Sequence, residues 1–121
     1  MKYEFKIIAF TDDPDFSISL ATECNKYGFL LSFIEDVNEI NAELEDNTIV
    51  VTLLDLHEYT ADPFKLCKSI KNKHGIPIFG VLNTFSKQLQ EKAKKSGFDL
   101  VFTKKMLIKS IREVVIHVSN E

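Results

Sequence analysis

The 121-residue sequence has only four glycines, and none of them is left to form a phosphate-binding loop. Gly28, Gly75 and Gly97 each come directly after an amphipathic stretch, where a left-handed backbone commonly ends a helix. Gly80 lies within an apolar run. The patterns GxGxxG and GxxxxGK(S/T), whose backbone wraps nucleotide phosphates, are both absent. These absences count against a nucleotide-binding enzyme.

Cysteine, basic charge and long apolar runs are also scarce. Cys24 and Cys67 lie on the apolar sides of predicted helices, and no CxxC or CxxH spacing offers a zinc site. The net charge of −3 lacks the basic excess of a nucleic-acid-binding protein, so we expect no nucleic-acid partner. No segment approaches the ~20 apolar residues of a membrane span, and charges interrupt the N-terminal stretch where a signal peptide needs an apolar run. We therefore expect a cytoplasmic protein with no membrane partner.

What the sequence does contain is a regular alternation of short apolar runs and amphipathic stretches. With 45% hydrophobic and 27% charged residues, residues 1–121 fit a single globular domain. Five apolar runs, rich in Val, Ile, Leu and Phe, have the length of buried strands. They are Phe5–Phe10, Leu30–Ile34, Thr48–Leu54, Pro77–Leu82 and Leu100–Thr103. Their nearly continuous apolar character predicts a parallel sheet with helices over both faces.

Helical patterns separate these runs. Asp13-Pro14 and Asp62-Pro63 each pair an Asp N-cap with a proline in the first turn, so they predict two helix starts. A second helix is expected around Val37–Leu44, and a fourth, mostly polar helix around Ser86–Ser96. The last helix carries the clearest apolar stripe with a period near 3.6, formed by Leu107, Ile108, Ile111, Val114, Val115 and Val118.

Strands that alternate with helices predict an α/β fold, a doubly wound five-stranded parallel sheet of order 2-1-3-4-5. In this order a site forms at the carboxyl ends of strands 1 and 3, where the winding reverses. Asp12 follows the first strand, Asp55 the third and Lys104 the fifth, so the three should share one crevice. Mg²⁺ would relieve the repulsion between two carboxylates, and a lysine could neutralise a phosphoryl oxygen.

Four stretches of the sequence resemble the receiver domains of response regulators. They are Leu53-Leu54-Asp55-Leu56, Asp62-Pro63-Phe64-Lys65-Leu66-Cys67, Ile76-Pro77-Ile78, and Ser96-Gly97-Phe98-Asp99 followed by Phe102-Thr103-Lys104. The resemblance runs without gaps from about Lys6 to Val118, and the combination carries it rather than any single piece. It implies the flavodoxin-like receiver fold.

The resemblance also implies roles for individual residues. Asp55 would be the phosphoacceptor, and Lys104 would pair with the phosphoryl group. Asp12, Asp55 and the backbone carbonyl of His57 would hold Mg²⁺. The binding should be weak, because Thr11 stands where the family has the first of two acids. The chain would then be a signalling module rather than an enzyme, with a histidine kinase or phosphotransfer protein and an output protein as partners.

Three positions depart from the family pattern. Leu82 replaces the switching Ser or Thr after strand 4, Val101 replaces the switching aromatic, and Lys105 replaces a proline. Leu82 cannot hydrogen-bond a phosphoryl group, and Val101 has no ring to rotate. The alternative is therefore a pseudo-receiver that binds a partner protein without phosphorylation. An enzyme or cofactor binder, such as a flavin protein, is a third possibility, since one fold serves many functions.

Overall fold

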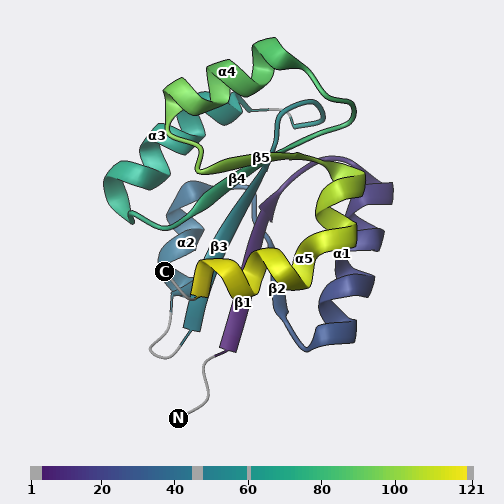
Figure 1. Cartoon of the computed structure of the whole chain (residues 1–121). Coiled ribbons are helices and arrows are strands. Elements are labelled where there is room, and N and C mark those ends of the chain that lie inside the picture. The colour runs from purple at the N-terminus through teal and green to yellow at the C-terminus, as the bar shows by residue number, and fades with distance from the viewer. Residues whose placement is uncertain (1–3, 45–47, 60, 120–121) are drawn as a thin grey trace.

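Five parallel strands form the central sheet, in the predicted order β2-β1-β3-β4-β5 (Figure 1). The computed structural model describes residues 4–44, 48–59 and 61–119. Of residues 118 and 119 it describes the backbone alone. The strands are β1 (Glu4–Phe10), β2 (Leu30–Phe33), β3 (Thr48–Asp55), β4 (Ile78–Leu82) and β5 (Leu100–Thr103). Each predicted strand is confirmed to within one residue at either end.

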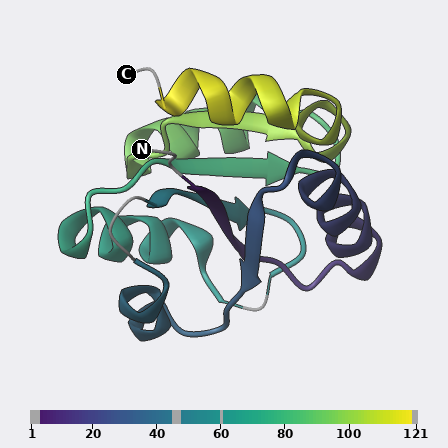
Figure 2. The same cartoon turned by 90° about the horizontal axis from the view of Figure 1, so that it is seen from below.

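Helices cover both faces of the sheet (Figures 1 and 2). α1 (Pro14–Tyr27) and α5 (Lys104–Ser119) pack on one face. The 3₁₀ turn η1 (Val37–Glu39), α2 (Ile40–Glu43), α3 (Pro63–Lys73) and α4 (Lys87–Ser96) lie on the other. None of the described helices has the length and apolar character needed to cross a membrane.

The predicted helix starts are confirmed by their capping bonds. Asp13 accepts hydrogen bonds from the backbone N–H groups of Asp15 and Phe16, and Asp62 caps α3 in the same way. Gly28, Gly75 and Gly97 have positive φ, as expected for residues that end helices. The second helix differs from the prediction. It is split into η1 and a four-residue α2, because Ile40 is the only residue of this stretch that is buried.

The core has one apolar layer on each face of the sheet. β3 lies between these layers and is buried over its last six residues, from Val50 to Asp55. Gly80 of β4 allows the layer under α3 and α4 to close. A Cβ atom at Gly80 would lie only 3.1 Å from side-chain atoms of Leu56 and Phe98. This packing holds the carboxyl end of β3, and therefore Asp55, in a rigid frame.

Candidate functional site

Asp55 is the last residue of β3 and is almost completely buried, with 1% of its surface exposed. Its Oδ1 accepts hydrogen bonds from the backbone N–H groups of His57 (2.9 Å) and Glu58 (2.8 Å). Its Oδ2 accepts one from the Thr11 hydroxyl at 2.5 Å and lies 2.8 Å from the Lys104 ammonium. A carboxylate has about four acceptor positions, so the protein itself satisfies this one fully.

Lys104 joins three carboxylates at the first turn of α5. Its Nζ lies 2.8 Å from Oδ2 of both Asp13 and Asp55, and 3.4 Å from Oε2 of Glu58. The ammonium is itself buried, with a side chain only 11% exposed. One cation thus contacts three acids, and the side chains of two of them, Asp13 and Asp55, are largely buried. Charge–charge interactions are stronger there than in water.

The contacts shift the pKa values of Asp55, Asp13 and Lys104. Burial raises the pKa of Asp55, but the hydrogen bonds that it accepts outweigh burial, so its pKa is below the ordinary value of 3.8. The hydrogen bond from Lys104 is the largest cause of the lowered pKa of Asp13. Burial lowers the pKa of Lys104, but Asp13 and Asp55 outweigh it and raise the pKa above 10.5. At neutral pH all three groups are charged.

These shifts predict that the protein loses stability in acid. A carboxyl group whose pKa is lowered by folding stabilises the folded state above its unfolded pKa, near 3.8 for Asp, and this contribution is lost as the pH falls through the folded pKa. We expect the free energy of unfolding, measured by urea denaturation, to fall as the pH drops from 5 to 2. Asp55→Asn should make this fall shallower. Glu39→Gln, at an exposed acid of η1, should leave the pH dependence unchanged. Equal pH dependence in the wild type, Asp55→Asn and Glu39→Gln would contradict a stabilising role of the Asp55 carboxylate.

Asp13, the neighbour of Asp12, is one of the acids that contact Lys104. The predicted crevice brings Asp55 and Lys104 together, but the third acid beside them is Asp13, which also caps α1. Asp12 instead lines a neighbouring cavity with Glu35, Tyr59 and Ala61. The Asp13 carboxylate caps α1 and also reaches Lys104 of α5, and the place of Asp12 in the crevice stays a prediction. Metal binding by Asp12 stays a prediction.

The same group of acids could hold a divalent cation. One oxygen each of Asp13, Asp55 and Glu58 lies within 4.8 Å of the others, and carboxylate oxygens suit hard cations such as Mg²⁺. These residues fit a metal ion, but the Lys104 ammonium already contacts all three. A cation must compete with Lys104, which gives a stronger reason for weak Mg²⁺ binding than the single acid expected after β1. The predicted role of the His57 carbonyl stays a prediction.

Apolar packing holds the two positions where the family has its switch. Leu82 is 1% exposed and belongs to the core layer beneath α3 and α4. Val101 is partly buried against the same layer. A hydrogen bond joins the loops that follow β3 and β4: the backbone N–H of Asn83 donates to Nδ1 of His57 at 2.8 Å.

Sequence reasoning missed three contributors to the site. Glu58 was not considered, although an acid three residues after Asp55 lies at the same edge of the sheet. Thr11 was treated as a lost acid, but its hydroxyl binds the Asp55 carboxylate. The hydrogen bond from Asn83 to His57 has no signal in the sequence, because a backbone group makes it.

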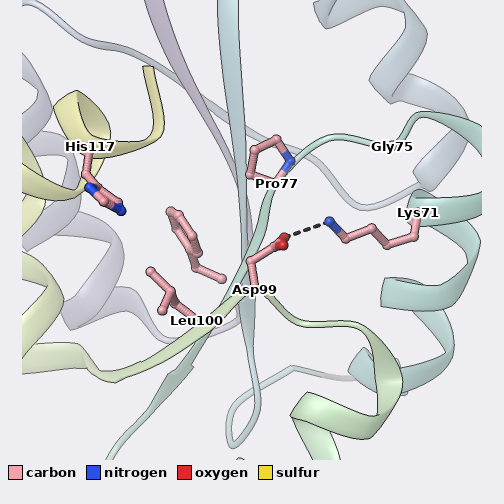
Figure 3. A pocket seen from close by; sticks show the side chains of 7 residues that line it. Lys71, Gly75, Pro77, Asp99, Leu100 and His117 are labelled. Carbon is pink, nitrogen blue, oxygen red and sulfur yellow. Dashed lines mark hydrogen bonds and ion pairs between the residues drawn. The ribbon is translucent and has the colours of Figure 1, made fainter. Parts of the chain in front are cut away.

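A second concavity, of about 320 Å³, lies at the opposite end of the sheet (Figure 3). Its lining residues come from α3, α5 and the amino ends of β4 and β5: Lys71, Gly75, Pro77, Phe79, Asp99, Leu100 and His117. The main polar groups already bind each other. Lys71 Nζ lies 2.6 Å from Asp99 Oδ2, which also accepts from the Ile78 N–H at 2.8 Å. We therefore place the candidate site at Asp55.

Solved structures of response regulators are similar to this chain over most of its length. A two-component response regulator from Clostridium difficile has a TM-score of 0.79 at 20% identity, covering 98% of both chains. A CheY-like receiver domain protein from Methanospirillum hungatei JF-1 has a TM-score of 0.70 at 16% identity, again covering 98% of both. The Mn²⁺-bound form of response regulator Rcp1 has a TM-score of 0.68 at 15% identity, covering 90% of both. No protein-family model and no curated protein matches the sequence. The chain has the receiver fold, as the sequence resemblance predicted.

Proposed function

We propose that this chain, with its receiver fold, is a receiver domain of a two-component signalling system in which Asp55 accepts a phosphoryl group. The observation that carries the proposal is the Lys104 ammonium, which binds the carboxylates of Asp55 and Asp13 at the carboxyl edge of the sheet. The buried Asp55 carboxylate offers a nucleophile for phosphoryl transfer, and the lysine beside it offers a cation. The cation stabilises the charge that arrives with the phosphoryl group.

In the proposed reaction Oδ2 of Asp55 is the nucleophile, since two backbone N–H groups hold Oδ1. Oδ2 attacks the phosphorus of a phosphohistidine, the P–N bond breaks, and its electrons return to the imidazole of the donor. The Thr11 hydroxyl and the Lys104 ammonium must turn from Oδ2 to the incoming phosphoryl oxygens. A bound Mg²⁺ would neutralise these oxygens, and Asp13, Asp55 and Glu58 are the side chains placed to hold it.

The donor would be a histidine kinase or a phosphotransfer protein, and an output protein would read the result. The chain would then be a signalling module of the cytoplasm rather than an enzyme. We propose neither a nucleic-acid partner nor a membrane partner for this function.

Mass spectrometry after incubation with acetyl phosphate and Mg²⁺ tests the phosphorylation directly. We expect the intact protein to gain one phosphoryl group that hydroxylamine removes, as expected for an acyl phosphate. Asp55→Asn should prevent the gain, while Asp36→Asn, at an exposed acid before η1, should not. A phosphoryl group that persists in Asp55→Asn would place the chemistry elsewhere and contradict the proposal.

A second candidate function is protein binding that does not depend on phosphorylation. It is favoured by the buried Leu82, which cannot follow a phosphoryl group, and by the Asp55 carboxylate, whose oxygens are already satisfied. A ligand that contacts two states equally cannot shift their populations. The usual route from phosphorylation to a changed surface is therefore missing.

For this candidate we expect Asp55→Asn, or treatment with phosphodonor, to change the affinity for the output partner by less than about threefold, or ~0.7 kcal/mol. Lys92→Glu combined with Lys95→Glu should weaken binding more, because docking would use the exposed surface of α4. Calorimetric titration of the partner with and without phosphodonor measures both. A tenfold response to the donor that is lost in Asp55→Asn would rule the second candidate out.

A further inference from the structure

Positive charge is concentrated in one part of the chain. Residues 63–96 contain eight lysines and a single acid, Glu91, so this segment carries a net charge of +7 within a chain whose total is −3. The eight are Lys65, Lys68, Lys71, Lys73, Lys87, Lys92, Lys94 and Lys95. All of them lie on α3 and α4. We call this surface the α3–α4 lysine face.

Several of these lysines lie along the contact between the two helices. Lys92 of α4 lies over the ring of Phe64 in α3, with Nζ 4.3 Å from the ring centre. Lys68 is one helical turn after Phe64, and Lys95 is one turn after Lys92, so both follow the same seam. α3 and α4 lie side by side on the sheet in Figure 1, and the Cys67 thiol contacts the Ser96 carbonyl at 3.5 Å. Lys68, Lys92 and Lys95 therefore border one seam between the two helices.

Within the described residues, the lysine face is largely unneutralised. Only Lys71 forms an ion pair, with Asp99 at 2.6 Å. Lys65, Lys68 and Lys95 are exposed and take part in no ion pair. Like charges one turn apart destabilise a helix, and ordinary surface helices intersperse acids to avoid this cost. An anionic surface that covers the face would relieve this repulsion.

We propose that the α3–α4 lysine face binds a carboxylate-rich segment of a partner protein. Charge complementarity with an acidic partner motivates the assignment, and it holds whether or not Asp55 is phosphorylated. The face has no arginine, the residue that suits the bidentate recognition of phosphates. The acids Glu35, Asp36 and Glu39 in and before η1, which contacts α3, flank the face and repel a long polyanion such as a nucleic acid that extends beyond it.

An exposed aromatic ring gives the same surface an apolar contact. Phe85 is 65% exposed and lies two residues before Lys87, the first residue of α4. Its neighbour Ser86 caps the helix through its side chain, which fixes the chain at this point. Large aromatic side chains supply much of the binding energy at interfaces. The partner segment would therefore combine several acids with an apolar residue at the end that meets Phe85.

Fluorescence anisotropy with a labelled peptide of ten glutamates and one terminal phenylalanine tests the proposal. We expect binding at low salt that weakens at least tenfold between 25 and 250 mM NaCl, as exposed charge pairs are screened. The variant Lys65→Gln, Lys68→Gln, Lys95→Gln should weaken binding about tenfold, and Phe85→Ala about threefold. The control Lys26→Gln, Lys105→Gln, Lys109→Gln removes the same charge from other elements and should change the affinity less than twofold. Circular dichroism melting shows that both triple variants are folded.

Two results would overturn the assignment. One is equal loss of peptide binding in the two triple variants, or no binding of the peptide at low salt, because then the face is only a solvated surface. The other is tighter binding of a single-stranded oligothymidylate of equal charge that is lost only in the α3–α4 variant. This outcome would make the face a nucleic-acid surface and not a site for acidic proteins.

Discussion

Replacing Lys104 with methionine is expected to lower the free energy of unfolding at pH 7 by about 3 kcal/mol. Methionine keeps an apolar stem beside Phe16, whose ring lies 5.4 Å from the ammonium, so the packing changes little. The variant leaves Asp13, Asp55 and Glu58 close together without a cation. Asp55 would then be a buried carboxylate that has lost its counterion. Urea denaturation in chelator-treated buffer measures the change.

Divalent cations should distinguish this electrostatic cause from a packing defect. The wild-type protein should bind Mg²⁺ weakly, because the Lys104 ammonium competes for the same oxygen atoms. In Lys104→Met we expect Mg²⁺ to bind at least tenfold more tightly and to restore part of the lost stability, since a ligand that binds only the folded state stabilises it. Titrating Mg²⁺ while following the amide signals near Asp55 measures the affinity.

Two further variants serve as controls for Lys104→Met. Lys105→Met changes the exposed neighbouring lysine and should cost less than about 0.5 kcal/mol. Asp55→Asn combined with Lys104→Met should cost less than the sum of the single changes, because the two groups interact directly. Additive costs together with unchanged Mg²⁺ affinity would mean that Lys104 stabilises the fold only through packing.

The parts of the site that the sequence predicts well are those set by the ends of buried strands. Asp55 ends β3 and Lys104 follows β5, and parallel strands bring their carboxyl ends to one edge whatever the loops do. Strand ends do not decide whether Asp12 or Asp13 contacts Lys104. Successive residues after a strand point in different directions, and the bonds that cap α1 decide which carboxylate faces Lys104. No periodicity in the sequence carries that information.

The lysine face shows a second limit of reasoning along the chain. The short basic run from Lys92 to Lys95 fits a solvated helix face when it is considered alone. The fold places Phe64 of α3 against Lys92 of this run, and a strand and two loops separate the two helices in sequence. The sequence alone therefore does not show that the basic run adjoins the lysines of α3. The order 2-1-3-4-5 was predictable, but which surface residues of neighbouring helices meet depends on side-chain packing across the seam.

Replacing Leu82 with threonine is expected to be the most costly change in the switch region. Leu82 is almost fully buried, and the change both removes apolar volume and introduces a hydroxyl into the core layer. We expect the free energy of unfolding to fall by about 3 kcal/mol, measured by urea denaturation. Leu100→Thr is the matched control at an exposed strand position, 43% exposed, and should cost less than about 1 kcal/mol.

The same variant tests the second candidate function, in which phosphorylation leaves the wild-type surface unchanged. Leu82 ends β4, and its neighbour Val81 pairs with Asp55, so position 82 lies at the same edge of the sheet as the proposed phosphorylation site. Acetyl phosphate with Mg²⁺ should therefore recover at least about 1 kcal/mol of the stability lost in Leu82→Thr, because one new hydrogen bond to a charged group contributes about 1.5–3 kcal/mol. It should have no such effect in Leu82→Thr combined with Asp55→Asn. An equal gain in stability of the wild-type protein would show that the phosphoryl group stabilises the fold without a hydroxyl at position 82. The apolar side chain of Leu82 would then not explain why phosphorylation leaves the surface unchanged.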